Sequence, residues 1–318
     1  MKIVLSSWQK GFYMKRKIKD YFRYFLYRIF QFIFLIMPKF LMKQFLIFFA
    51  FLAYKLNKKH KKIAYANLEL VYQNRLTQAR KDEILYNSYK SLLFNMYEFM
   101  ENQTISKEKM FEKAHIVNAE IIENAIKNKR KIIYITAHYG GWELALPYIA
   151  LKFGKIAVVN RKMDNPHIQK LYSKARDKNN ITMLEKQVAA KGMLKAFKED
   201  KAVAVVIDQH IGNGAEVEFL GQKDMATDST SRLALKFDAI IIPIFPVCNG
   251  FRDYTIKVCE PLDVTQIVFQ TNDAIEELTQ MQTDIITKQI FEKPDDWFWQ
   301  HKRFKKYHND IYKKERSV

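Results

Sequence analysis

The sequence predicts an α/β protein whose largely parallel or mixed sheet is covered by helices, with an N-terminal hydrophobic membrane anchor in front of it. Three observations predict this architecture. Unbroken apolar runs such as KIIYIT at 131–136 and AVAVVID at 202–208 are typical of strands buried on both faces. Helical patterns alternate with these runs, as expected when helices join parallel strands. Hydrophobic residues make up 48% of the 318-residue chain, which is enough to fill the core of one large domain.

The α/β elements begin after about residue 62. Helices are expected at 82–101 and 117–129, before the first strand. Asn165 and Pro166 predict the start of a later helix, with Asn165 as the N-cap and Pro166 in the first turn. Strands are expected at 131–136, 155–159, 202–208, 239–247 and 254–258, and further helices at 142–152, 166–178, 187–199, 226–237 and 271–291.

An apolar stretch at residues 24–54 is rich in Phe, Leu and Ile, but charged residues and Pro38 interrupt it. No uncharged run reaches the roughly 18–20 residues that a simple spanning helix needs. Pro38 is expected to kink or end a helix near Met37. The stretch therefore predicts either one tilted, kinked membrane helix or two short helices lying in the membrane interface. A buried helix pair of a soluble domain is the alternative.

The net charge of +19 is concentrated at the two ends of the chain. Residues 1–62 contain 15 Lys and Arg with one acidic residue, and residues 301–318 contain 7 with two acidic residues. Residues 63–300 balance 31 basic residues against 31 acidic ones. This distribution predicts a neutral body held against an anionic membrane and disfavours a nucleic-acid enzyme, whose basic residues spread over its working face. Basic clusters on both flanks of the apolar stretch favour a dip into one leaflet over a crossing.

The sharpest motif is AHYGGWE at 137–143, directly after the first predicted strand. His138 is expected at the carboxyl edge of the sheet, where open α/β sheets bind ligands. Glu143 lies five residues later, so the two side chains can meet only if Gly140 and Gly141 fold the chain back. A carboxylate on one ring nitrogen would leave the other as a general base. The alternative is a strand-end histidine with an ordinary hydrogen bond, and a carboxylate that stabilises a helix N-terminus.

Two further sites follow strands at the same predicted edge. Arg161 can hold a phosphate or stabilise an oxyanion, or else it is a surface arginine that pairs with Asp164. Asp208 and Gln209 close the strand at 202–208. Asp208 is expected either to orient a catalytic or substrate-binding group or to cap the next turn.

The sequence gives little support for a metal or cofactor. His210 and His138 without clustered cysteines would make a weak zinc site. The chain has two cysteines, Cys248 and Cys259, which are too few for a disulfide scaffold or a cysteine-based zinc cluster. Nucleophile-elbow, P-loop and dinucleotide-binding motifs are absent from the sequence. We therefore expect neither metal nor cofactor.

The C-terminal stretch places Trp297, Trp299 and His301 beside Lys302 and Arg303. Indoles beside cations are typical of a membrane interface that carries phosphate headgroups. We therefore expect scaffold and lipid-facing surface here, and a core-capping Trp pair with a solvated tail is the alternative.

These motifs together resemble a family. The HxxxxE box after an apolar strand is similar to that of the bacterial lipid A late acyltransferases of the lauroyl/myristoyl type, which are relatives of the glycerolipid acyltransferases with an HxxxxD box. The resemblance spans about residues 24 to 305. Leu220 departs from it, replacing the second aromatic residue of a Phe-Phe-Gly block, and the anchor is more basic and broken than a plain spanning helix. The other matching blocks are ANLELVY at 66–72, NRKMDNP at 160–166, IDQH at 207–210, FLG at 219–221 followed by Thr227, and PDDWFWQHKRF at 294–304.

The resemblance implies a glycerolipid-acyltransferase-like fold and a membrane-bound O-acyltransferase. The implied donor is an acyl carrier protein thioester. The implied acceptor is a hydroxyacyl chain of a Kdo-lipid A precursor, at the cytoplasmic side of the inner membrane, in lipopolysaccharide or lipooligosaccharide biosynthesis. His138 and Glu143 would be catalytic, and Arg161, Asp208 and Gln209 would bind substrate or stabilise the oxyanion. Anionic inner-membrane lipids are a further expected partner, and nucleic acid is not.

The expected organisation has four segments. They are a basic N-terminal segment at 1–23, the membrane anchor with its basic flank at 24–62, a catalytic acyltransferase domain at 63–305, and a basic tail at 306–318. Two alternatives stay open. A glycerolipid (lysophosphatidate-type) acyltransferase shares the same acid–base logic, and a non-catalytic basic protein that binds membrane or nucleic acid explains the charge but not the HYGGWE box.

Overall fold

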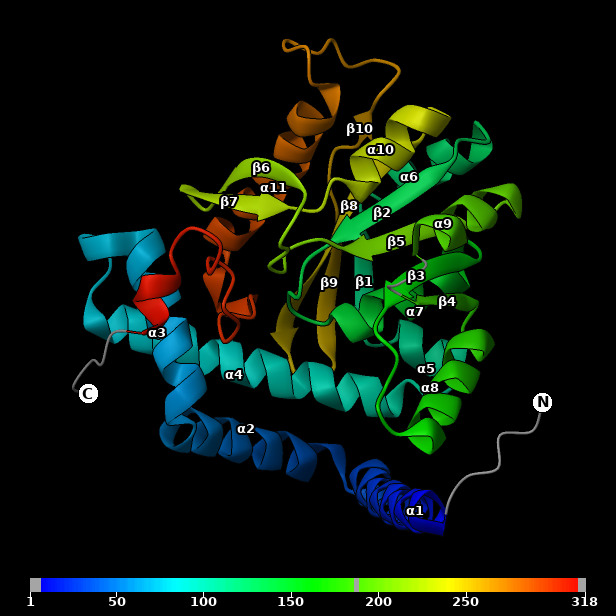
Figure 1. Ribbon diagram of the computed structural model, residues 1–318, viewed down its shortest axis with the longest axis vertical. Coiled ribbons are helices and arrows are strands. Elements are labelled where there is room, and N and C mark those ends of the chain that lie inside the picture. The colour runs from blue at the N-terminus through cyan, green and yellow to red at the C-terminus, as the bar shows by residue number, and fades with distance from the viewer. Residues whose placement is uncertain (1–6, 186–188, 314–318) are drawn as a thin grey trace.

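The computed structural model describes residues 7–185 and 189–313 (Figure 1). Three stretches of interest lie outside the described residues. They are 1–6 of the expected basic N-terminal segment, 187–188 of the helix expected at 187–199, and 314–318 of the expected basic tail. The helices are α1 (Ser7–Ile36), α2 (Lys39–Leu56), α3 (Lys58–Tyr72), α4 (Gln78–Glu101), α5 (Lys107–Phe111), α6 (Ala119–Lys127), α7 (Trp142–Phe153), α8 (Pro166–Lys178), α9 (Ala189–Lys198), α10 (Ser229–Phe237) and α11 (Ala274–Glu292). The strands are β1 (Ala114–Val117), β2 (Ile132–Thr136), β3 (Ile156–Asn160), β4 (Ile181–Glu185), β5 (Ala202–Val206), β6 (Ala215–Phe219), β7 (Gln222–Ala226), β8 (Ile240–Gly250), β9 (Asp253–Val258) and β10 (Leu262–Asp263).

The main sheet is mostly parallel. In the described part of the chain its order is β1-β9-β8-β2-β5-β3-β4, with β10 beside β8. The run β8-β2-β5-β3-β4 is parallel, which confirms the expected sheet type. β9 is antiparallel to β8 because only two residues connect the two strands, and such a short connection permits only a hairpin. The hairpin β6-β7 forms a separate small sheet that packs against α11 (Figure 1).

Helices cover both faces of the sheet, as the apolar strands predicted. Along β2, Ile133 and Ile135 belong to one buried cluster, which includes residues of α4, α9, α10 and α11. Ile132 and Tyr134 belong to a second cluster on the other face, with residues of α6 and α7. Every β2 side chain is buried, so the strand has no polar alternation.

All the strands and helices expected from the sequence are present. The structure adds β1, β4, β6, β7 and β10, which the sequence pattern did not indicate. β1 and β10 have only four and two residues, too few for a periodic signal. β6 alternates buried and exposed residues over a short stretch, and β4 lies at the edge of the sheet with mixed burial.

The N-terminal region forms separate helices and is not a single kinked one. α1 ends at Ile36 and α2 begins at Lys39, so the break expected at Pro38 is confirmed. Taken alone, none of the described helices has both the length and the apolarity to cross a bilayer. Lys39–Leu56 and Lys58–Arg75, bent by 82°, meet these criteria only as a pair.

Large apolar side chains are exposed along α1 and α2, which lie at one side of the molecule (Figure 1). Phe32 is 64% exposed and Phe40 is 69% exposed. The opposite side of α2 packs against α4 through Met42, Leu46 and Ala50. We call the exposed set the anchor face; it consists of Ile18, Tyr21, Phe22, Phe25, Leu26, Ile29, Phe30, Phe32, Ile33, Ile36, Phe40, Leu41, Phe48, Phe49, Phe51 and Leu56.

A buried charge network joins α2 to the body. The Glu101 carboxylate of α4 pairs with Lys39 of α2 at 3.1 Å, with Lys113 at 3.1 Å and with Arg252 at 3.0 Å. Burial would raise the pKa of Glu101, but these three cations outweigh it and hold the pKa at about 2. The start of α2 is thus tied to the edge of the sheet by charge as well as by packing.

Candidate active site

The loop after β2 makes a tight turn that depends on two glycines. Gly140 has a φ of +52°, and a Cβ there would lie 1.8 Å from the Pro246 carbonyl oxygen. A Cβ on Gly141 would lie 2.6 Å from the Tyr254 ring. The Gly141 N–H donates to the Pro246 oxygen at 3.0 Å, which fixes the turn against β8. The turn expected from the sequence is confirmed, and it ends where α7 begins.

Asp208 orients the His138 ring. His138 Nδ1 lies 2.7 Å from Asp208 Oδ1, and the His138 peptide N–H donates to Asp208 Oδ2 at 3.0 Å. Burial would raise the pKa of Asp208, but the His138 ring and the hydrogen bonds to the carboxylate hold the pKa well below its usual value. A carboxylate at Nδ1 favours the tautomer with the proton on that atom, which leaves Nε2 as an acceptor. Nε2 lies 3.2 Å from the Gln209 Nε2 atom.

No hydrogen bond or ion pair joins the Glu143 carboxylate to the His138 ring among the described residues, so the expectation that the glycine turn brings this carboxylate to the imidazole is wrong. The Glu143 carboxylate instead pairs with Arg176 of α8. The reason is local: Glu143 lies in the first turn of α7, where its N–H donates to Asn95 Oδ1 at 2.9 Å. The helix therefore points this side chain toward α8, while the segment that follows β5, the neighbour of β2, supplies the carboxylate that reaches His138.

A cavity of about 600 Å³ lies at the carboxyl ends of β2, β3 and β5. His138, Glu143, Arg161 and Gln209 all line it, so four of the five predicted site residues share one cavity. Asp208 is fully buried behind His138 and does not line it. Much of the remaining wall is apolar and comes from Leu146, Val158, Met193, Val205 and Ile211, among others. Such a lining suits a ligand with a polar reacting group and an apolar chain.

The two arginines of the cavity lie in different settings. Arg161 is 78% exposed at the rim and pairs with Asp164 at 2.8 Å, the contact that the surface alternative anticipated. Arg176 is buried, and its guanidinium donates to the Tyr172 hydroxyl at 2.6 Å as well as to Glu143. Neither Arg176 nor Tyr172 was predicted from the sequence. Their spacing of four residues, in a helix whose start Asn165 defines, was the available signal.

The C-terminal block is buried, so the lipid-facing surface expected for its Trp residues is wrong. Trp297 and Trp299 are fully buried, and Arg303 is buried against Asp224 at 2.7 Å. The Trp297 indole N–H donates to Asp208 Oδ2 at 2.8 Å. The scaffold role expected for this block is confirmed, and the core-capping alternative describes its Trp pair.

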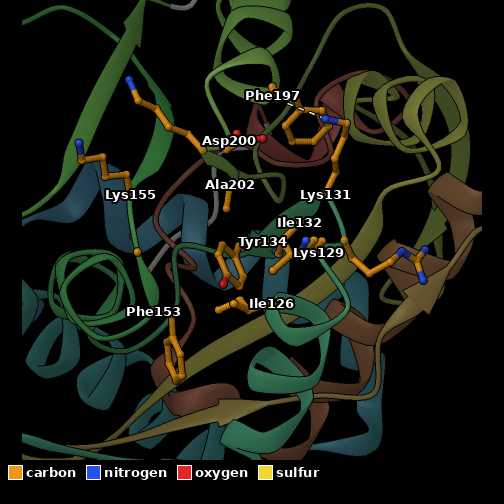
Figure 2. Close-up of a pocket in the computed structure, with 13 residues that line it drawn as sticks. Ile126, Lys129, Lys131, Ile132, Tyr134, Phe153, Lys155, Phe197, Asp200 and Ala202 are labelled. Atoms are coloured by element: carbon orange, nitrogen blue, oxygen red, sulfur yellow. Dashed lines mark hydrogen bonds between the residues drawn. The ribbon is translucent and has the colours of Figure 1, made fainter.

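A second cavity, of about 430 Å³, lies at the opposite edge of the sheet, where β2, β3 and β5 begin. Figure 2 shows Tyr134, Ile126 and Phe153 in this cavity and the lysines Lys131 and Lys155 around it. None of the residues predicted for the site lines it. Ligands of open α/β sheets bind at the carboxyl ends of the strands, so the cavity beside His138 is the candidate active site.

Comparisons with known proteins find one family along nearly the whole chain. The family described as bacterial lipid A biosynthesis acyltransferase matches residues 9–306. The chain is 25% identical over 258 residues to the lipid A biosynthesis lauroyltransferase of Escherichia coli (strain K12), which covers 80% of this chain and 82% of that protein. It is 23% identical over 214 residues to lipid A biosynthesis acyltransferase 2 of Shigella flexneri, a match that covers 66% of this chain and 67% of that protein. It is also 23% identical over 214 residues to the lipid A biosynthesis myristoyltransferase of Escherichia coli (strain K12), a match that covers 66% of this chain and 65% of that protein.

Replacing Gly140 with alanine should destabilise the protein by at least about 2 kcal/mol, because the new Cβ would strain the left-handed backbone and clash with the Pro246 oxygen. Chemical unfolding followed by circular dichroism measures this. Gly212→Ala is the control, because a Cβ there meets nothing within 4 Å. An unchanged unfolding midpoint for Gly140→Ala would contradict the turn geometry.

His301 should make stability depend on pH. Burial lowers its pKa to about 4, and its Nε2 is buried without a hydrogen-bond partner among the described residues. Between about pH 4 and 6.5 the unfolded chain therefore binds more protons than the folded one, so His301 lowers stability as the pH falls through that window.

His301→Asn should lose less stability than the wild type between pH 6.5 and 4.5, by up to roughly 1.4 kcal/mol per pH unit. Denaturant unfolding at several pH values measures the difference. His115→Asn, at an exposed position of the edge strand β1, is the control. Parallel pH curves for His301→Asn and wild type would contradict the assignment.

Proposed function

Because the chain belongs to the bacterial lipid A biosynthesis acyltransferase family, we propose that it moves a fatty acyl chain from an acyl carrier protein thioester to a hydroxyacyl chain of a Kdo-lipid A precursor. The observation that carries the proposal is the His138 ring, which Asp208 holds at Nδ1 while Nε2 lies at the cavity. A base at the end of an apolar cavity suits the deprotonation of a hydroxyl next to an acyl chain.

His138 acts as the general base in this proposal. Its Nε2 takes the proton from the acceptor hydroxyl, and the oxygen attacks the thioester carbonyl carbon. The C–O bond forms, the C–S bond breaks, and the imidazolium returns its proton to the departing thiolate. No acyl-enzyme is formed, because the base activates the acceptor directly. Asp208 keeps the ring in the productive tautomer and stabilises the imidazolium during the step.

The other cavity residues bind and stabilise. Gln209 lies beside Nε2, and its amide is placed to donate to the carbonyl oxygen as negative charge develops there. Arg161 at the exposed rim is assigned to a phosphate of the acceptor. Glu143, fixed by Arg176 in the wall, presents a carboxylate that can accept a hydrogen bond from the acceptor and direct its hydroxyl toward the base.

We further propose that the anchor face holds the enzyme at the cytoplasmic side of the inner membrane. Its exposed Phe and Leu side chains would enter the acyl region, while the basic residues beside them, such as Lys19 and Lys55, would meet anionic headgroups. An anionic acceptor lipid and an acidic carrier protein would both be attracted by the basic ends of the chain. The four proposed segments remain 1–23, 24–62, 63–305 and 306–318, with α1 crossing the boundary between the first two.

Transfer to a tetra-acylated Kdo-lipid A precursor should fall at least roughly 10²-fold in His138→Ala and in Glu143→Ala, because a positioned base and its substrate contacts contribute about that much. Detergent-purified protein would be offered acyl carrier protein and coenzyme A thioesters in parallel, and the products would be read by mass spectrometry. His115→Ala, which changes an exposed histidine, should retain full activity.

The same assay separates the alternatives. Acylation of lysophosphatidate in place of the lipid A precursor would assign the enzyme to glycerolipid synthesis. Equal use of both thioesters would remove the carrier-protein proposal. Full activity in folded His138→Ala would remove the proposed base.

Vesicle flotation tests the anchor face. The triple variant Phe32→Ser, Phe40→Ser, Phe48→Ser should bind anionic vesicles at least about 10-fold more weakly than wild type, since each exposed side chain contributes roughly 1.5–3 kcal/mol when it is buried. Val268→Ser, which removes a 78% exposed apolar side chain outside the anchor face, should bind like wild type. Equal binding of the triple variant and wild type would exclude the anchor face as the contact.

A further inference from the structure

The C-terminal block closes over the loop that carries His138. The Gly140 N–H donates to the Asp296 carbonyl oxygen at 2.9 Å, and the Phe298 N–H donates to the His138 carbonyl oxygen at 3.0 Å. Tyr139 and Trp297 form an antiparallel bridge between these two bonds. Three successive residues of the block thus follow the loop backbone, although the bridged residues Tyr139 and Trp297 are 158 positions apart in the sequence. The loop cannot shift without moving this block.

The Trp297 indole completes the set of donors around Asp208. Its N–H donates to Asp208 Oδ2 at 2.8 Å, and the same oxygen accepts the His138 peptide N–H at 3.0 Å. The other oxygen, Oδ1, lies 2.7 Å from His138 Nδ1. Both carboxylate oxygens are therefore engaged, and rotation of the carboxylate would break all three contacts.

Trp297 is itself held from several sides. Its ring lies 4.6 Å from the Trp299 ring and 5.7 Å from the Phe219 ring, and it is fully buried. Its carbonyl oxygen accepts from the Ser88 hydroxyl of α4 at 2.6 Å. A buried indole fixed by packing and by its backbone can act as a rigid donor.

We propose that Trp297 is a positioning residue for acyl transfer, and that it acts through Asp208. Its indole N–H fixes the rotation of the carboxylate, and the carboxylate in turn keeps His138 Nε2 aimed at the acceptor hydroxyl. The proposal rests on the base role proposed for His138. It assigns a role in the chemistry to a block that composition alone would class as scaffold.

The surroundings of Asp208 make a pH profile a useful readout. Among the described residues, the charged or titratable side chains that act on it most are His138, His301 and Arg303. Burial keeps the pKa of His301 at about 4, and Arg303 is paired with Asp224. At pH values well above 4, His301 therefore stays neutral and Arg303 stays charged. A shift of the acid limb then reports on the His138–Asp208 pair.

The test compares Trp297→Phe with Trp299→Phe. Trp299 is an equally buried indole, but its N–H donates to the Pro294 carbonyl oxygen at 2.8 Å and not to a site residue. Trp297→Phe should lower kcat roughly 10- to 100-fold with little change in KM, because a small displacement of the base is enough for such a loss. The acid limb of its kcat/KM profile should move to lower pH, because a carboxylate that rotates away from Nδ1 stabilises the protonated ring less. Trp299→Phe should stay within about 3-fold of wild type.

A double-mutant cycle asks whether Trp297 acts through Asp208. In an Asp208→Asn background, Trp297→Phe should lower kcat by less than about 3-fold. An undiminished effect in that background would overturn the proposal. Equal losses of kcat in Trp297→Phe and Trp299→Phe, with both profiles unshifted, would also overturn it and leave a purely structural role.

A substrate-free readout separates this proposal from the proposed function. Nitrogen NMR of ¹⁵N-histidine-labelled protein in detergent reports the tautomer of the His138 ring, with His138→Ala used for assignment. The proton on Nδ1 should be retained in Trp299→Phe and lost or averaged in Trp297→Phe. An unchanged tautomer in Trp297→Phe would overturn the positioning role. If the tautomer differs between Trp297→Phe and Trp299→Phe as expected but the wild type transfers no acyl chain, the proposed function alone is overturned.

Discussion

The buried carboxylate of Asp208 is the contact on which the geometry of the site depends. It joins three parts of the chain: the loop after β2, the end of β5 and the C-terminal block. A carboxylate removed from water is strongly unfavourable unless donors surround it, and here a ring nitrogen, a peptide N–H and an indole N–H do so. The same three donors that make its burial tolerable also fix the direction of the histidine ring. Stability and orientation are therefore two results of one arrangement.

The rest of the cavity follows from the order of the strands. β2, β5 and β3 are neighbours and parallel, so the residues that follow them meet at one edge. Apolar side chains of the strands and of α7 and α9 form much of the wall below that edge. A second ion pair, Glu143 with Arg176, spans α7 and α8 at the side of the cavity. The cavity thus combines polar groups that follow the strand ends with a largely apolar wall, an arrangement that suits a long-chain acyl substrate.

Much of this could be predicted from the sequence, because the signals were local. The Ile- and Val-rich runs defined the strands, the glycine pair defined the turn, and strand ends indicated the edge at which His138, Arg161 and Gln209 lie. The partner of His138 could not be predicted in the same way. Choosing between Glu143 and Asp208 required knowing that β5 lies beside β2, and strand order is a property of the whole sheet.

The prediction that the C-terminal tryptophans face lipid was wrong for a related reason. Indoles next to lysines have the same composition whether they face lipid or fill a core, and only packing against α3, α4 and the loop distinguishes the two. Arg176 was not predicted because an arginine in the last turn of a helix is usually solvated, and its burial depends on Tyr172 and Glu143.

The packing of α2 also limits how the protein can be handled in the laboratory. Met42 and Leu46 of α2 share a buried cluster with Phe94 and with Leu144, the neighbour of Glu143 in α7. Lys39 also supplies one of the cations around the buried Glu101. Trimming the chain before the body to obtain a more tractable enzyme would therefore open the hydrophobic core directly beneath the first turn of α7. The N-terminal helices are part of the folded unit, so a preparation that keeps the site intact has to keep these helices together with their exposed apolar side chains.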